Sequence, residues 1–558
     1  MKKINKYLLI GLAATLTTSC ADLDTEYLGG AVSTTQKEST LEYNPSMGTA
    51  SVTGMFTDFA GIFKISSNAH IDFGYPSVMI GLDSQGMDYT SKNSGYNWYS
   101  SYNGYSNRST TGWPDNMMWM YNYAQINICN TILPTIPADT ENNTLKFYRA
   151  QALAVRAFDY WTLIQVYQYN YDGYADAPGV CLLTDENIEE VAENGAPRAT
   201  VAEVYDQILK DLNEAVSLLE GNPVTADQII SDKPKRMVSL AVAYGLRARV
   251  YLTMHKYADA ANDAQRAIAA FSGRPYSIEE VSKPGFTSMS DASWMWGIAN
   301  AETDDWVANG SIVNFPAMSC TFSHGYCDQG GAWRWASRKL YDMIPATDVR
   351  KGWWLDENRK SANLNAAQQA YIDSFDKGTP NYGADATANM MPYTNVKFDS
   401  YQSVLSQSIN ASDVPMMRVE EMYLILAEGQ AMSGNTTGGL ETLTNFVKTY
   451  RNPEYVTTAS TAEAIQEEVW NQRRIELWGE GLSYFDIMRL HKDIDRRGCA
   501  FPAAWVYVIK YGEEGNGMLY LIPEDEISTN KAFTGAGEKD VFHKNNPAIT
   551  EPNPVAEN

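Results

Sequence analysis

Apolar residues recur every three to four positions in several long segments of the chain, a spacing that places them on one face of an α-helix. This pattern predicts helices over 143–169 and 200–219, and in the second Thr200 precedes Glu203 by three positions, which is a capping box. The same spacing predicts six more helices: one that follows Pro234 and ends near His255, and others over 257–271, 418–433, 438–450, 461–478 and 483–491. The chain is therefore predicted to be mainly α-helical.

Two consecutive pairs of these helices carry small and aromatic residues at the spacing of a tetratricopeptide repeat. In the first pair these positions, at successive offsets of 3, 9, 4 and 3, are Ala248, Tyr251, Ala260, Ala264 and Ala267. The second pair follows the same grid less closely, with Ala427, Gln430, Gly439, Leu443 and Phe446. Small residues allow two antiparallel helices to approach closely, so the pattern predicts a scaffold of tetratricopeptide-like helical hairpins.

Two long stretches, 89–116 and 273–410, lack this periodicity and are rich in aromatic residues. Loops of this length are uncommon in compact domains unless they carry function. Short runs of apolar residues predict a few strands, over 293–298, 505–510 and 518–522. The expected fold is thus a helical scaffold that supports a loop-rich, irregular region.

The first twenty residues have the pattern of an export signal. Three lysines among residues 1–6 precede a short apolar run over 7–16, and a small residue then precedes Cys20. This predicts a signal peptide over 1–19 and a lipid on Cys20, which would anchor the chain to a membrane. The alternative is an ordinary signal peptide that happens to be followed by a cysteine.

The formal charge is -24, and removal of the three signal-peptide lysines makes it -27. Such a chain repels nucleic acid and other polyanions, so a neutral or cationic ligand is favoured. Five cysteines remain after Cys20, of which Cys320 and Cys327 are close enough in sequence to close a small loop. The fold is not expected to depend on a disulfide framework, and no cysteine–histidine cluster has zinc spacing.

The aromatic stretches also contain short polar side chains, a combination suited to sugars. A sugar ring presents a flat face of C–H groups that stacks on an aromatic ring, with hydroxyls at its rim for hydrogen bonds. Tyr96 and Trp98 stand two apart, so an extended loop presents both on one side. The candidate ligand-binding residues are Tyr96, Trp98, Tyr99, Asn103, Trp306, Tyr326 and Trp333.

The alternative for these rings is that they pack the loops onto the body of the protein. Trp335 is predicted to point into the core, since it can begin a helix that continues through Leu340. Trp294 and Trp296 alternate in a strand-like run and are predicted to be structural.

A dense charged cluster near the C-terminal end suggests a second kind of site. Glu476 and Glu480 are four residues apart, and two carboxylates on one helix face could act as acid and base in a glycoside hydrolase. Because arginines and Asp486 surround them in the sequence, a salt-bridged helix is the preferred interpretation. No nucleophile, phosphate-loop or metalloprotease motif is present, and no catalytic residue or cofactor is predicted.

Calcium is the one metal considered, near Glu302, Asp304 and Asp305, where a solvated acidic turn is the favoured alternative.

Several segments together resemble the SusD/RagB family of outer-membrane lipoproteins of Bacteroidetes. The residues that carry the resemblance are the lipobox 16–20, RAQALAVRAFDYWTLIQVY over 149–167, the helix over 200–219, RVEEMYLILAEGQAMSG over 418–434, RRIELWGEGLSYFDIMRL over 473–490, and YLIP over 520–523. Trp478 and Gly479 depart from the family pattern before Glu480 and Gly481 without affecting the assignment. Acidic residues just after Cys20 are similar to the surface-export signals of such lipoproteins.

The resemblance implies a single body over 41–558 behind a tether over 20–40. The helical scaffold would cover about 120–272 and 411–495, and the ligand region about 60–119 and 273–410. Such proteins bind a polysaccharide or oligosaccharide at the outer membrane, facing the cell exterior. They form a lid over a SusC-like TonB-dependent transporter, pass it the glycan and are not enzymes. The alternatives kept open are a surface glycoside hydrolase and a lid protein whose cargo is a peptide.

Overall fold

The computed structural model confirms the mainly helical class and describes most of the chain. The described residues are 33–61, 70–307, 312–328, 330–375, 390–513, 515, 517–534 and 552–556. The predicted signal peptide and Cys20 lie outside these ranges. No helix among the described residues is both long enough and apolar enough to cross a membrane.

All eight predicted helices are present, with ends within a few residues of those expected. The α-helices are α1 Thr34–Tyr43, α2 Thr49–Thr57, α3 Tyr75–Gln85, α4 Ser100–Gly104, α5 Trp113–Ile132, α6 Asn143–Tyr167, α7 Tyr171–Tyr174, α8 Ile188–Asn194, α9 Val201–Leu219, α10 Ala226–Ile229, α11 Leu240–Thr253, α12 Tyr257–Ala270, α13 Ile278–Val281, α14 Phe315–Ser319, α15 Arg338–Met343, α16 Ala366–Asp373, α17 Val419–Met432, α18 Thr436–Tyr450, α19 Ala462–Glu476, α20 Ser483–Arg489, α21 Glu524–Thr529 and α22 Lys531–Thr534. The capping box between Thr200 and Glu203 is formed at the start of α9.

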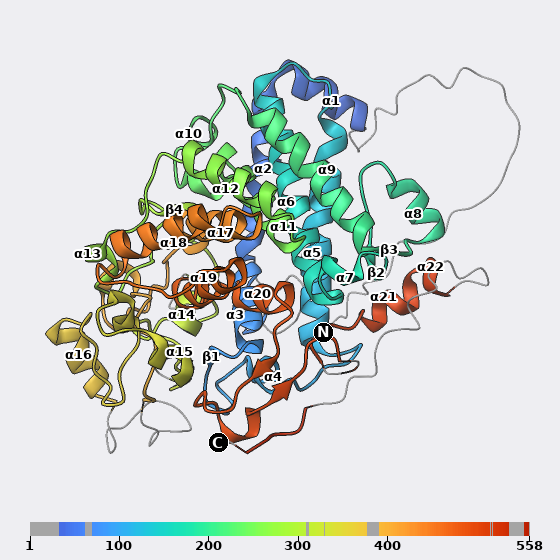
Figure 1. Ribbon diagram of the computed structural model, residues 1–558. Helices are drawn as coiled ribbons and strands as arrows, with labels where there is room; N and C mark the ends of the chain where they lie inside the picture. The colour runs from blue at the N-terminus through green and yellow to red at the C-terminus, as the bar shows by residue number, and fades with distance from the viewer. Residues whose placement is uncertain are drawn as a thin grey trace, which may run out of the picture.

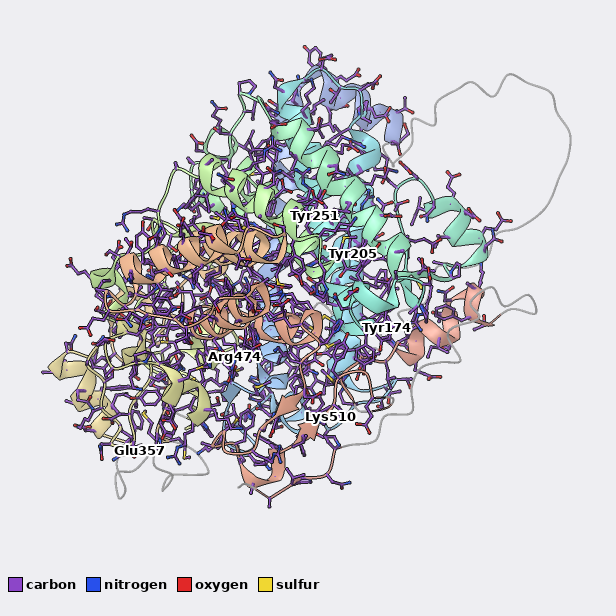
Figure 2. The ribbon with its side chains drawn as sticks, in the orientation of Figure 1. Tyr174, Tyr205, Tyr251, Glu357, Arg474 and Lys510 are labelled. Atoms are coloured by element: carbon purple, nitrogen blue, oxygen red, sulfur yellow. The ribbon has the colours of Figure 1, made fainter. Side chains whose placement is uncertain are left out.

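The long helices pack against one another in sequence order and form the scaffold (Figure 1). α6 lies between α5 and α9, α11 contacts α9 and α12, and α17 contacts α12, α18 and α19. The predicted repeat positions explain the close packing, because Ala248, Ala260, Ala264 and Ala267 are fully buried. Tyr251, which Figure 2 labels on α11, is half-buried.

Two glycines show how closely the second hairpin is packed. A Cβ atom on Gly429 of α17 would lie 2.7 Å from the backbone oxygen of Tyr257, and one on Gly439 of α18 would lie 2.6 Å from that of Ala427. Both distances are shorter than a van der Waals contact, so only glycine permits this approach of α17 to its neighbours. The less regular second repeat therefore relies on glycine where the first relies on alanine.

Two helices that the periodicity did not predict are nearly or wholly enclosed. Every residue of α3 is buried, and α5 is buried around most of its circumference. A helix enclosed on all sides has no polar face, so its sequence lacks the alternation that identifies a helix. The loop-rich region predicted over 60–119 consequently contains a central helix.

The strands are short and join segments far apart in the sequence. They are β1 Tyr89–Thr90, β2 Pro178–Cys181, β3 Arg198–Thr200, β4 Trp294–Ile298, β5 Trp335–Ala336, β6 Val414–Arg418, β7 Ile494–Asp495 and β8 Val508–Ile509, paired antiparallel as β1–β5, β2–β3, β4–β6 and β7–β8. The strand predicted over 293–298 is β4. The prediction over 505–510 is right only for β8, and the one over 518–522 is wrong, since that segment has no strand partner.

A buried ion network joins the scaffold to the loop-rich region. Glu476, at the end of α19, accepts hydrogen bonds from Arg451 (Nε–Oε2, 2.7 Å), Arg418 (Nη1–Oε1, 2.9 Å) and Arg350 (Nη1–Oε2, 3.2 Å). All four side chains are fully buried. Burial alone would raise the pKa of Glu476, but the three guanidinium groups hold it well below its ordinary value.

The network continues beyond the helix through Glu480. Its carboxylate binds Lys397 (Nζ–Oε1, 2.6 Å) and Arg418 (Nη2–Oε1, 2.8 Å). Glu480 does not lie on the same helix as Glu476, contrary to the prediction, because α19 ends at Glu476 and the chain turns through Gly479 and Gly481, at φ of +78° and +77°. A side chain at either glycine would be strained in this conformation.

The five described cysteines are free and buried, so Cys320 and Cys327 do not form a disulfide. The Cys320 thiol donates to the backbone oxygen of Phe398 at 3.2 Å. Burial raises the pKa of Cys327 to about 12, so this thiol stays protonated.

Replacing Glu476 with Gln should destabilise the protein strongly. The substitution leaves three buried guanidinium groups with one fewer countercharge, and breaking a buried ion pair from one side costs about 3–5 kcal/mol. We expect a decrease of that size in the free energy of unfolding, measured by urea denaturation followed by circular dichroism.

Glu467→Gln is the matched control, since Glu467 lies on the same helix and pairs with Lys492 at the surface. Exposed pairs contribute at most about 1 kcal/mol. Equal effects of the two substitutions would show that the buried network does not stabilise the fold.

Candidate aromatic binding site

The pairing of β1 with β5 brings the two predicted binding segments together. Tyr89 lies opposite Ala336 and Thr90 opposite Trp335. The loop after β1, which carries Tyr96 and Trp98, therefore lies beside the segment before β5, which carries Tyr326.

Four rings from three separate segments meet at this point, and we call them the aromatic cluster: His70, Tyr96, Trp98 and Tyr326. The imidazole of His70 stacks on Trp98, with ring centroids 4.4 Å apart and planes within 10°. Tyr326 meets both rings edge-on, at 5.3 Å from His70 and 6.0 Å from Trp98. Tyr96 lies 6.2 Å from Tyr326. The cluster thus brings together three of the residues that were predicted to bind a ligand.

The aromatic cluster is partly open to solvent and carries no charge. His70, Tyr96 and Trp98 are half-buried, whereas Tyr326 is 7% exposed. Burial lowers the pKa of His70, so its ring is neutral at pH 7. The Tyr326 hydroxyl lies 2.9 Å from His70 Nδ1, which fixes the orientation of both rings. Parts of the His70, Tyr96 and Trp98 side chains are therefore accessible to solvent.

Buried polar contacts hold the loop that carries Tyr96 and Trp98. Between them, Asn97 is 1% exposed and its Oδ1 accepts a hydrogen bond of 2.7 Å from Arg334 Nη1. Asn97 Nδ2 donates to Asn103 Oδ1 at 3.2 Å. Since the backbone on both sides of Asn97 is fixed in this way, the flanking rings have little freedom to move.

Tyr99 and Asn103 belong to this support and not to a ligand surface. Both side chains have 0% exposure. The Tyr99 hydroxyl donates to Ser77 Oγ at 2.8 Å, and Asn103 Nδ2 donates to the backbone oxygen of Ser84 at 2.9 Å. The prediction that they contact a ligand is corrected: their role is to anchor the loop on α3.

The turn that carries Tyr326 is held in the same manner by one carboxylate. Asp328 accepts from the backbone nitrogen of Gly325 at 2.7 Å, from the Tyr371 hydroxyl at 3.0 Å and from Ser406 Oγ at 2.7 Å. Tyr371 lies on α16, so Asp328 connects the turn to two other segments of the loop-rich region.

The remaining predicted tryptophans lie apart from the aromatic cluster. Trp333 is 1% exposed and packs edge-on against Phe375, so its predicted ligand contact is also corrected. Trp306 is half-buried, donates to Asn300 Oδ1 at 2.8 Å, and has no ring contact with the cluster within the described residues. As predicted, Trp335, Trp294 and Trp296 are core residues, although Trp335 lies in β5 and does not begin a helix, since α15 starts at Arg338.

His70 was not predicted as a site residue, and no sequence pattern identifies it. No other histidine is near it in sequence, and it stands 26 positions before Tyr96, so neither spacing nor composition connects it to the loop. Only the folded chain brings it under Trp98.

The charged cluster is not a catalytic pair. Both carboxylates are enclosed by arginine and lysine, and these cations hold the pKa of Glu476 and that of Glu480 below their ordinary values, although burial alone would raise them. Neither carboxyl is therefore a proton donor at neutral pH, which a hydrolase of this kind requires.

Within the described ranges, no three histidine, cysteine, aspartate or glutamate side chains are placed to hold a metal. Asp304 instead accepts from the backbone nitrogen of Ala301 in a turn, and Glu302 accepts from the Tyr401 hydroxyl.

These features define a binding protein in which stacked helical hairpins support an aromatic surface assembled from loops. Family models identify it further: one described as starch-binding and associating with the outer membrane matches residues 74–252, and the SusD family model matches residues 318–552. The chain belongs to the SusD/RagB family.

Individual relatives agree with this assignment. The chain is 23% identical over 412 residues to the SusD-like protein P38 of Formosa agariphila, covering 68% of this chain and 73% of the relative. A SusD-like carbohydrate-binding protein of Bacteroides vulgatus has the same fold, with a TM-score of 0.70, 22% identity, and coverage of 88% of this chain and 97% of the other.

The surface glycan-binding protein A of Bacteroides thetaiotaomicron, solved with laminarihexaose, has a TM-score of 0.61 at 17% identity, covering 87% of this chain and 97% of the other. These structures are described as carbohydrate-binding proteins, which agrees with the prediction that the chain is not an enzyme.

The pKa of His70 reports directly on the integrity of the aromatic cluster. Trp98→Ala removes the ring stacked on the imidazole and admits water, so the pKa of His70 should rise toward its ordinary value of 6.5. The measurement is an NMR pH titration of the imidazole signals. Trp306→Ala, which removes a half-buried ring elsewhere, should leave the titration unchanged. A His70 titration that is the same in Trp98→Ala as in the parent would contradict the stacking.

Proposed function

We propose that this chain is a cell-surface lipoprotein that captures a neutral polysaccharide or oligosaccharide on the aromatic cluster. It delivers the glycan to a SusC-like TonB-dependent transporter in the outer membrane. The observation that supports the proposal most is the convergence of Tyr96, Trp98, Tyr326 and His70 from three segments at one partly exposed surface.

The physical argument concerns what such a surface can bind. An uncharged aromatic face stacks against the C–H face of a sugar ring, and each contact of this type contributes on the order of 1 kcal/mol beyond the area that it buries. Several rings held in place are needed for useful affinity, and the buried contacts of Asn97 and Asp328 hold them. The net charge of -24 disfavours anionic polysaccharides.

The family supports the same function. The model that matches residues 74–252 is described as starch-binding and outer-membrane-associated, and one structural relative was solved with a glucan oligosaccharide. The proposed lipid anchor on Cys20 rests on the export signal in the sequence. The proposed role as a lid over a SusC-like transporter rests on the family resemblance. A peptide cargo is the alternative, and it predicts retention of peptides by the same rings.

Trp98→Ala should weaken glycan binding about tenfold, because it removes one stacking ring and releases His70. The lipid-free chain is first run in affinity electrophoresis through gels that contain starch, laminarin, xylan, galactomannan or pectin. Calorimetry with the glycan that retards the parent protein then measures the loss of affinity. Neutral glycans should retard the protein and pectin should not, with no reducing sugar released.

Tyr43→Ala is the matched control, since Tyr43 is 93% exposed on α1, at the opposite end of the molecule from β1 and α4 (Figure 1). Retention that Trp98→Ala leaves unaltered would place the glycan elsewhere, and retention of peptides alone would favour the alternative cargo.

Cys20→Ala should abolish lipid attachment, since acyl chains on that cysteine are the proposed anchor. Labelled palmitate should enter the parent protein and the control Thr35→Ala, an exposed position outside the lipobox, and both should sediment with the outer membrane. Labelled Cys20→Ala protein in the membrane fraction would argue against lipidation at this residue.

A further inference from the structure

A polar pocket lies in the loop-rich region, outside the aromatic cluster. It has a volume of about 400 Å³ and lies between the start of α16 and the segment 399–405. The polar side chains that line it and matter here are Lys283, Asn365, Gln368, Asp399 and Ser403. Neither the family resemblance nor the aromatic pattern identified these residues.

Asp399 is the acceptor of this pocket. Its side chain accepts from the backbone nitrogen of Ser400 at 2.8 Å and from Ser403 Oγ at 2.7 Å, and it forms no ion pair with any described residue. The residue is only 6% exposed, and burial raises the pKa of its carboxyl group. Two carboxylate oxygens can accept about four hydrogen bonds, so acceptor capacity remains for a ligand.

Asn365 and Gln368 supply donors. In the capping box of α16, Asn365 Oδ1 accepts from the Gln368 nitrogen, and Gln368 Oε1 accepts from the Asn365 nitrogen. This uses both side-chain oxygens and leaves both amide NH₂ groups without an acceptor in the described part of the chain. With Lys283 at the same pocket, one cation and one anion line it together with neutral donors.

This combination matches a neutral polyhydroxylated ligand. Each sugar hydroxyl both donates and accepts, so one hydroxyl can donate to a carboxylate while its neighbour accepts from an amide. An anion would meet Asp399, and a cation would meet Lys283. The backbone beside Asp399 is also unusual, since Gln402, Ser403 and Ser406 have φ values of +57°, +57° and +54°. Non-glycine residues in this conformation cluster at ligand-binding sites.

The pocket and the aromatic cluster share a support. Ser406, three residues after Ser403, donates to Asp328, which holds the turn of Tyr326. Tyr371 of α16 donates to the same carboxylate. Ser403 is three Cα–Cα steps from Ser406, and Tyr326 is two steps from Asp328. Together with the hydrogen bond between Ser406 and Asp328, the path along the chain from Ser403 to Tyr326 is about 25 Å, so the two residues are no farther apart than this.

We propose that this pocket is a second subsite, in which Asp399, Asn365 and Gln368 bind the hydroxyls of a neutral sugar unit of the chain held at the aromatic cluster. The inference rests on the proposed glycan function. It adds that the protein selects glycans long enough to reach both places.

The test measures, by calorimetry, the affinity of the lipid-free chain for oligosaccharides of two to eight units. These are prepared from the polysaccharide that retards the protein in affinity electrophoresis. In the parent protein, affinity should rise with length until both places are filled. Asp399→Asn and Gln368→Glu should each remove about tenfold of the affinity for the long oligosaccharides and leave the short ones unchanged. Gln368→Glu keeps the oxygen that the capping box needs, so α16 remains formed.

Asp373→Asn is the control, because Asp373 is an exposed carboxylate on the same helix, paired with Lys360. If Trp98→Ala weakens every oligosaccharide while Asp399→Asn and Gln368→Glu weaken none, the second subsite is disproved and the proposed function stands. If no glycan in the panel binds, both fail.

Discussion

The position of Glu476 at the end of α19 constrains the rest of the structure. Three arginines from different segments bind its carboxylate: Arg350 from the 3₁₀ turn Val349–Trp353, Arg418 from the end of β6, and Arg451 after α18. None of these charges reaches water, so each requires the others to be in place. The two glycines that follow α19 return the chain so that Glu480 can neutralise Lys397 and share Arg418. The helical scaffold and the loop-rich region therefore meet at this buried ion network, which forms only when all of its side chains are in place.

The same principle extends to the binding surface, where regular structure is sparse. β1 and β5 have two residues each, which is too few to fix a loop by backbone pairing alone. Buried side chains supply what the strands do not. Arg474 of α19, labelled in Figure 2, binds Asp88 beside β1 with an Nε–Oδ2 distance of 2.7 Å, and Arg334 binds Asn97. One contact thus fixes the residue before β1 to α19, and the other fixes the residue between Tyr96 and Trp98 to the segment before β5. This gives rings on an irregular loop a fixed position, which a weak sugar contact needs if it is to contribute affinity.

The sequence predicted the scaffold well because periodicity and capping are local. Thr200, Glu203 and the alanines of the first hairpin needed no knowledge of distant segments. The prediction was weaker where an element is enclosed, as in α3, or where structure comes from pairing between segments, as with β7, which pairs with β8 and was not predicted as a strand. For the candidate site, composition indicated the loops that carry the aromatic cluster but could not distinguish the half-buried rings from the enclosed ones. Trp98 and Trp333 have the same side chain and each has another aromatic residue two positions away, yet one is half-buried and the other is enclosed. That difference depends on Phe375 and His70, which no local pattern connects to them.

Asp328 shows why the two binding places are better regarded as one surface. A carboxylate that accepts from Gly325, Tyr371 and Ser406 fixes the turn of Tyr326, the helix α16 and the strained segment that follows Asp399. Because one carboxylate binds all three, Tyr326 and the segment that follows Asp399 are held in fixed positions relative to each other before a ligand binds. In the proposed function, a long glycan that reaches both places would lose no affinity to reorganisation of the protein, whereas a short one would gain only the stacking on Trp98. The proposed selection for chain length would thus follow from the shared support of Asp328, and it requires no contact between the aromatic cluster and the pocket.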